Sequence, residues 1–220
     1  MLSDQIDSRR FFAAISMASA LLTLALVLTA APPQGAPSDL LAYFRANQGR
    51  FVVLAIVVLT WVIVSLLAVV ATGRLVAGDR PLLGLAATLA SSGGILLLGF
   101  GTFIFVGAFF ALNAATQGSV EVAQANYQAS FWYNMSFLLS DPGLMVLGGG
   151  QAILGWLAWR SRAIHRFAGA VGVAGGLAGL LTLAVYQTPF LAIIQLLSLC
   201  ITNVAAGVAL SRIERTDPGK

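Results

Sequence analysis

Charged side chains are scarce in this 220-residue chain. Lysine and arginine together number 12, aspartate and glutamate number 8, and charged residues make up 9% of the sequence. Soluble domains carry about 25% charged residues, so the composition excludes a water-soluble fold. Hydrophobic residues make up 59% of the chain, which is typical of a protein that lies mostly within a lipid bilayer.

Histidine, cysteine and lysine occur once each, and each single occurrence excludes a kind of site. One histidine, His165, excludes bis-histidine haem ligation and a multi-histidine metal site within one chain. One cysteine, Cys200, excludes an intrachain disulfide. The lysine, Lys220, is in the tail, which excludes a Schiff base inside a helix bundle. Since G-x-S-x-G, H-E-x-x-H and Walker motifs are also missing, we expect no enzyme and no catalytic, cofactor-binding or metal-binding residue.

Long apolar runs replace the missing charge. A membrane-spanning helix needs roughly 20 apolar residues, and the runs here are continuous rather than alternating, which favours helices over a β-barrel. We expect an all-α fold, a single transmembrane domain over 1–220 made of a bundle of six transmembrane helices. The predicted spans are 11–31, 51–72, 82–112, 142–160, 165–186 and 189–211. The first run is longer than the apolar part of a signal peptide, so we interpret it as a retained helix.

The basic residues divide unequally between the two ends of these spans. Ten of them belong to the termini and to the loops after the second and fourth spans, whereas Arg45 and Arg50 belong to the opposite side. Positively charged loops stay in the cytoplasm, so we expect a multi-pass protein of the cell inner membrane with both termini cytoplasmic. The net charge of +4 is explained by these helix ends, and we expect the lipid bilayer but no nucleic acid as a partner.

Two segments on the opposite side are more than connectors. Residues 38–45 predict a short helix, capped by Ser38, that lies along the membrane surface. Residues 113–141 are long and mixed, and the Asp141-Pro142-Gly143 sequence predicts a turn before the fourth span. None of the eight acidic residues is then at the middle of a span, which argues against a proton pump or an acid-coupled antiporter.

Two isolated polar residues, His165 and Glu121, are candidate sites. His165, in an arginine-rich loop, could contact a phosphate or a lipid headgroup, but an anchor that only sets topology is the stronger interpretation. Glu121 could act as a base or bind a cation outside the membrane. With no second acid or histidine at helical spacing, a solvated surface residue is favoured.

Uncharged polar residues recur at helical spacing within the apolar spans. Two interpretations are open: they pack helices against one another, or they line a neutral polar cavity for a small or amphipathic solute. Packing is favoured, although Gln151, Gln195 and Asn203 are large amides that need partners in hydrocarbon. The candidate residues for cavity or packing are Ser92, Thr102, Gln151, Gln195, Ser198, Thr202 and Asn203.

The stretch from Gly155 to Gly169 resembles a junction in a group of bacterial six-helix inner-membrane proteins of unknown function. In that group a tryptophan and a small residue precede Arg-Ser-Arg, an apolar pair, a proline, an arginine and a glycine-rich helix. This chain has His165 where the group usually has proline. The resemblance covers about residues 151–180 and the six-span plan. It implies an inner-membrane location and transfers no functional residue.

Three classes of function are open to a membrane protein with this sequence. The first is a non-enzymatic membrane protein, an accessory or interaction subunit that contacts another membrane protein or forms a homo-oligomer. The alternative is a small permease or a protein that binds a lipid or amphipathic solute. A continuous cavity touching Gln151 and Gln195 would favour transport, and dry packing there would favour the accessory role. A membrane enzyme, with catalytic residues drawn from 113–141 or from a partner, has the least support.

Overall fold

The computed structural model describes residues 2–29, 40–116, 121–182 and 189–213, and these residues form helices joined by short connections without any β-strand. The all-α class is therefore confirmed. The helices are α1 (Leu2–Thr29), α2 (Leu40–Ala46), α3 (Gln48–Val76), α4 (Pro81–Ala115), α5 (Val122–Ser161), α6 (Arg166–Leu181) and α7 (Pro189–Ile213).

Five helices are long and apolar enough, by length and composition, to cross a membrane: α1, α3, α4, α5 and α7. This indicates a multi-pass membrane protein. The predicted fifth span, 165–186, corresponds to α6, whose 16 described residues are fewer than the roughly 20 that a bilayer requires. Residues 183–186 of that predicted span lie outside the described residues, so the expected count of six transmembrane helices is not confirmed.

The predicted turn before the fourth span was wrong, although residues 142–160 are helical as expected. Residues 142–160 were expected to begin after a turn, but α5 is one helix of 40 residues with Pro142 inside it, and its apolar part runs from Tyr127 to Ser161. Proline removes one helical hydrogen bond, yet tertiary packing holds the backbone here. A Cβ atom at Gly143 would lie 3.0 Å from the backbone nitrogen of Leu98 on α4. Asp141 consequently lies within the apolar part of α5 rather than in a turn before it.

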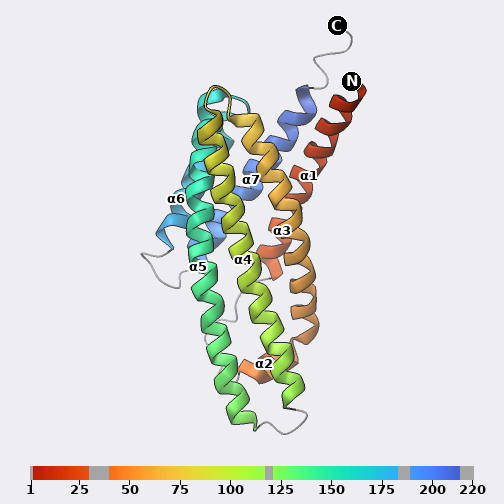
Figure 1. Cartoon of the computed structure of the whole chain (residues 1–220), viewed down its shortest axis with the longest axis vertical. Helices are drawn as coiled ribbons and strands as arrows, with labels where there is room; N and C mark the ends of the chain where they lie inside the picture. The colour runs from red at the N-terminus through yellow and green to blue at the C-terminus, as the bar shows by residue number, and fades with distance from the viewer. Residues whose placement is uncertain (1, 30–39, 117–120, 183–188, 214–220) are drawn as a thin grey trace.

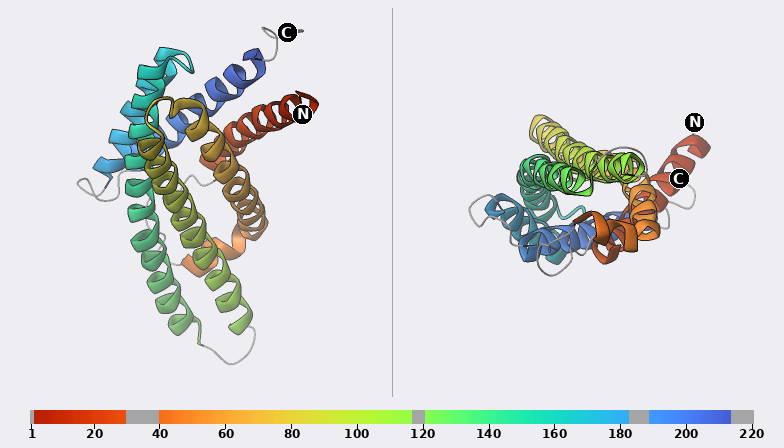
Figure 2. Two further views of the ribbon diagram at one scale, coloured as in Figure 1. Left: turned by 45° about the horizontal axis from the view of Figure 1, so that its top comes forward. Right: turned by 90° about the horizontal axis from the view of Figure 1, so that it is seen from below.

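Two long helices, α4 and α5, extend along the molecule from one end to the other, α3 stops short of the far end above α2, and α1, α6 and α7 occupy the half that contains both termini (Figure 1). α1 packs against α3 and α7, and α6 packs between α5 and α7. Seen from below, the long helices are arranged in a ring (Figure 2). Their contacts follow the order α4, α5, α6, α7, α1, α3 and back to α4.

Glycines allow the closest helix pairs to form. α4 and α5 meet where a Cβ atom at Gly150 would lie 2.6 Å from the carbonyl oxygen of Ala87. α5 and α6 meet in the same way, because a Cβ atom at Gly155 would lie 2.6 Å from the backbone nitrogen of Val173. Such contacts between backbones are the usual basis of helix packing in lipid.

The predicted short helix is observed as α2, and one of its faces packs against the bundle while Ala42 and Arg45 on the other face are exposed; the predicted cap, Ser38, lies outside the described residues. Leu41 and Phe44 are completely buried. The ring of Phe44 lies 4.8 Å from that of Phe51 and 5.2 Å from that of Phe109, measured between centroids. Arg45 then donates hydrogen bonds to side chains at the end of α4, Asn113 and Thr116. Aromatic contacts thus fix α2 against α3 and α4.

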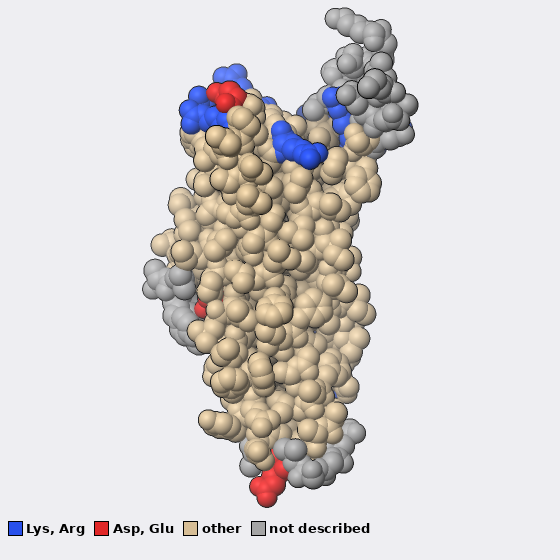
Figure 3. All heavy atoms as spheres, viewed as in Figure 1, with Lys and Arg blue, Asp and Glu red and all other residues tan. Residues whose placement is uncertain are grey.

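Basic side chains gather at the end of the molecule that carries the termini (Figure 3). The antiparallel helices explain this arrangement, since the loops after α3 and α5 and the start of α1 all reach that end. Arg160 lies 3.8 Å from Asp79, and the guanidinium groups of Arg80 and Arg160 lie 5.2 and 5.7 Å from the ring centre of Trp156. The sequence pattern of basic loops therefore corresponds to one physical end.

Candidate functional site

The predicted polar residues of α5 and α7 form a hydrogen-bonded cluster. The Nε2 atom of Gln151 donates to Ser198 Oγ at 2.5 Å, and Ser198 Oγ donates to the backbone oxygen of Gln195 at 2.8 Å. The Nε2 atom of Gln195 donates to the backbone oxygen of Leu144 at 2.8 Å. Both amide nitrogens thus donate across the α5–α7 interface, whereas the Oε1 atoms of Gln151 and Gln195 are buried without a hydrogen-bond partner among the described residues, which is costly in hydrocarbon.

Glycines of α6 provide the room for this cluster. The side chain of Ser198 lies where a Cβ atom would be at Gly175, and the amide of Gln195 lies where one would be at Gly179. Gln195 is completely buried. The small-residue face of α6 and the polar face of α7 are therefore two sides of one interface.

A second polar cluster joins α1, α3 and α7. Asn203 Nδ2 lies 3.0 Å from Ser19 Oγ, which lies 2.8 Å from Ser65 Oγ. One turn along α1, the indole nitrogen of Trp61 donates to Thr23 Oγ1 at 2.9 Å. Every one of these side chains is buried. Three helices are thus connected by side-chain hydrogen bonds in a region otherwise filled by apolar residues.

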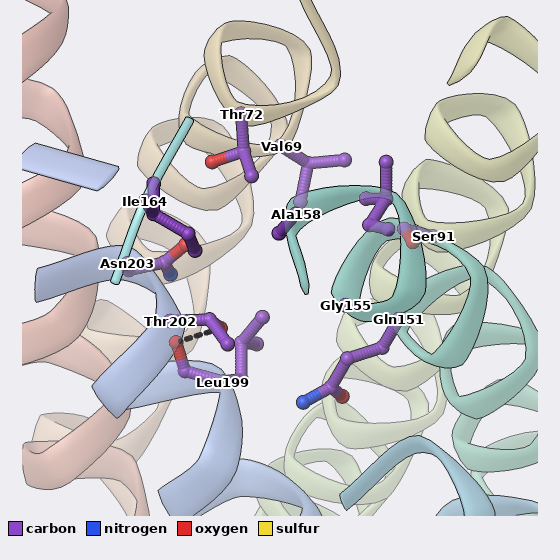
Figure 4. Close-up of a pocket in the computed structure, with 11 residues that line it drawn as sticks. Val69, Thr72, Ser91, Gln151, Gly155, Ala158, Ile164, Leu199, Thr202 and Asn203 are labelled. Atoms are coloured by element: carbon purple, nitrogen blue, oxygen red, sulfur yellow. Dashed lines mark hydrogen bonds between the residues drawn. The ribbon is translucent and has the colours of Figure 1, made fainter. Parts of the chain in front are cut away.

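A small cavity of about 20 Å³ lies between the two clusters. A buried water needs about 10–15 Å³ by this measure, so the cavity has room for one water molecule. Gln151 extends towards it from α5 and Thr72 from α3, while Ile164 covers it from the loop after α5 (Figure 4). The lining comprises Val69, Thr72, Ser91, Gln151, Leu154, Gly155, Ala158, Ile164, Leu199, Thr202 and Asn203.

The candidate residues fall into three groups. Gln151, Thr202 and Asn203 line the cavity. Gln195 and Ser198 belong to the α5–α7 cluster but do not line it. Ser92 and Thr102 are only half-buried and do not line it either. The hydroxyl of Thr102 donates within its own helix to the backbone oxygen of Leu98. The structure therefore brings five of the seven predicted residues together.

Several buried polar residues around the cavity and in the second cluster were not predicted. Thr72 Oγ1 and Ser91 Oγ line the cavity, and neither has a hydrogen-bond partner among the described residues. Ser19, Thr23 and Ser65 form the cluster on α1 and α3. Ser16, Ser19 and Thr23 recur at helical spacing in the first apolar run, and this stripe was the signal that could have identified the face of α1 that packs inward.

His165 and Glu121, the two isolated polar candidates, both lie at the start of a helix. His165 begins α6, and its Nδ1 atom accepts a hydrogen bond from the backbone nitrogen of Phe167 at 3.3 Å. Glu121 is exposed where α5 begins. Within the described ranges, no group of three or more histidine, cysteine, aspartate or glutamate residues could hold a metal ion.

Comparison of the chain with protein-family models, with curated protein sequences and with solved structures found no match.

Proposed function

We propose that this protein is a non-enzymatic membrane protein that acts by binding another membrane protein, as an accessory or interaction subunit. The observation that carries the proposal is the use of the interior polar groups. The amide nitrogens of Gln151, Gln195 and Asn203 all donate to groups on neighbouring helices, and the cavity beside them has room for only about one water molecule. An interior with so little free space favours a packed bundle over a solute pathway. A partner would then bind on the outer surface of the bundle.

The proposed orientation places both termini in the cytoplasm of a bacterial cell, with the protein in the inner membrane. It is supported by the positions of Arg74, Arg160 and Arg212 in the last turns of α3, α5 and α7 and of Arg80 directly before α4, because loops rich in arginine remain cytoplasmic. Single cysteines introduced at Asp79 and Glu121, in a chain whose Cys200 is replaced by serine, test this directly. A membrane-impermeant thiol reagent added to intact spheroplasts should label position 121 and spare position 79.

Isolation of the protein with its surroundings tests the proposed binding role. The full chain, tagged at its carboxyl terminus and extracted in a mild detergent, should co-purify with a distinct membrane protein in constant proportion. Crosslinking in intact membranes before extraction should trap the same pair. Repeated isolation of this chain alone, with and without crosslinking, would contradict the proposal.

A small permease remains the second candidate, and the cavity under Ile164 is the observation that favours it. The cavity does not touch Gln195, so a transported solute would have to separate α5 from α7. Replacement of Gln195 with leucine should then abolish solute uptake while the amount of protein in the membrane stays unchanged. Unchanged uptake would remove the permease from consideration.

A further inference from the structure

Asp141 lies at the middle of the apolar bundle, which is an unusual position for a carboxylate. A Cβ atom at Gly101 on α4 would lie 2.8 Å from the side chain of Ser140, the neighbour of Asp141. Gly99 on α4 in turn packs against Val62 on α3. Contacts therefore place Asp141 near the level of Val62.

Val62 marks the centre of the apolar layer. It is twelve residues from Arg50 and twelve from Arg74, the two arginines that bound the apolar part of α3. At 1.5 Å per residue each arginine is about 18 Å away along the helix, and half of a bilayer core is about 15 Å. Asp141 is thus close to the midplane of the proposed membrane.

No basic residue of this chain can reach Asp141 there. The sequence has no lysine, arginine or histidine within 11–44, 51–73, 81–159 or 167–211. On α5 itself, Arg160 is 19 residues away, about 28 Å along the helix. A second copy of the chain has the same gap and cannot supply a cation either. Acidic groups in membranes are costly and almost always pair.

Two apolar side chains that flank Asp141 on α5 are exposed. Leu138 and Met145, three residues before and four residues after Asp141, share its helical face and are 60% and 37% exposed. α7 reaches α5 at Leu144, through Gln195. Pro142 lacks an N–H group, so the carbonyl of Leu138 does not receive its usual helical hydrogen bond and can accept one from a partner.

We infer that Asp141 is the docking point for a membrane-spanning helix of a partner protein that carries a lysine or arginine near the bilayer centre. The inference rests on the proposed binding role and names the chemistry of the partner. The cation would pair with the carboxylate and could donate a further hydrogen bond to the Leu138 carbonyl. Leu138 and Met145 would pack against apolar side chains on either side of the cation.

A synthetic transmembrane peptide tests this inference without knowledge of the natural partner. The full chain is reconstituted in phosphatidylcholine vesicles, and energy transfer reports its association with a leucine-rich peptide that has one central lysine. A second peptide has leucine at the same place. We expect about tenfold tighter association with the lysine peptide, which is the size of polar contacts measured between model helices. Equal association of the unaltered chain with both peptides would overturn the inference.

Variants assign the effect to Asp141. Asp141→Asn and Asp141→Leu should both lose the preference for the lysine peptide over the leucine peptide. The leucine variant should still fold, because it removes a charge from hydrocarbon, so its loss of preference reports on binding. Asp141→Lys should instead prefer a peptide with a central aspartate. Glu121→Gln is the matched control at the exposed start of α5 and should retain the lysine preference. A preference that survives in Asp141→Asn would overturn the inference.

The two proposals fail in different ways. If a natural partner co-purifies equally well with the unaltered chain and with Asp141→Asn, the binding role holds and the docking point is elsewhere. If the lysine peptide binds through Asp141 but no natural partner co-purifies, the docking chemistry holds and the accessory role is contradicted.

Discussion

The side-chain amide of Gln195 on α7 occupies the space that a Cβ atom would need at Gly179 on α6. Gln195 is fully buried, and its Nε2 atom is held by the backbone oxygen of Leu144 on α5. The amide therefore connects α7 with α5 across a gap that exists because residue 179 has no side chain. The packing of α5, α6 and α7 therefore depends on the contact between Gln195 and Gly179.

Gly179→Ala should lower the free energy of unfolding by about 1–3 kcal/mol, the usual cost of an extra methyl group in a well-packed interior. Thermal unfolding in detergent measures the change. Gly107→Ala is the matched control, since a Cβ atom at Gly107 has no neighbour within 4 Å, and alanine there should be neutral or stabilising by up to about 1 kcal/mol. Equal stability of the two variants would mean that Gln195 has another place to lie.

Gln151→Leu and Ser198→Ala should be coupled. The Gln151 amide donates to Ser198 Oγ at 2.5 Å, so either single change removes the same hydrogen bond. A double-mutant cycle should show a coupling of about 0.6–2 kcal/mol, the range observed for polar contacts between membrane helices. Thr102→Val, whose hydroxyl bonds within its own helix, should add to Ser198→Ala without coupling. Additive effects of the first pair would contradict the contact.

Thr23→Val should destabilise the protein by about 1–3 kcal/mol, because it leaves the buried indole N–H of Trp61 without its acceptor. Thr60→Val is the matched control on the outer face of α3, where the hydroxyl bonds to the backbone oxygen of Ile56 and no other helix depends on it. Its effect should stay within about 0.5 kcal/mol. Chemical unfolding followed by tryptophan fluorescence measures both.

Arg162→Gly should stabilise the protein by about 1 kcal/mol. Arg162 ends α5 with a φ of 58°, a left-handed conformation that costs a residue with a side chain about 1–2 kcal/mol and glycine very little. Arg162→Ala removes the same charge but keeps the Cβ atom, so it should give no such gain. If both variants raise the thermal midpoint equally, loss of the charge rather than relief of backbone strain is responsible.

The fold class was predictable because membrane helices have only one way to satisfy their backbone in lipid. The spans of α3 and α4 were predicted to within a few residues, since each is a continuous apolar run without an internal charge. α5 was not predictable in the same way. Asp141, Pro142 and Gly143 favour a turn locally, but Gly143 allows α4 to approach so closely that the helix continues.

The candidate site was predictable in part, and the reason is geometric. Helical spacing identified the inward faces that carry Gln151, Gln195 and Asn203, because a face that avoids lipid keeps a regular repeat. The repeat does not say which faces meet. The pairing of Asn203 with Ser19, separated by 184 positions, and the exclusion of Gln195 from the cavity both follow from how the helices pack.

The sequence by itself determined that this protein is helical, apolar and basic at one end, because those properties follow from composition and from the order of residues along each helix. Tertiary structure alone decided that Leu41 and Phe44 of α2 are buried, that α5 is continuous and that a carboxylate lies near the middle of the bundle. The physical reason is that each of these depends on close contact between segments far apart in the chain: aromatic rings around Phe44, and backbone meeting backbone at Gly143.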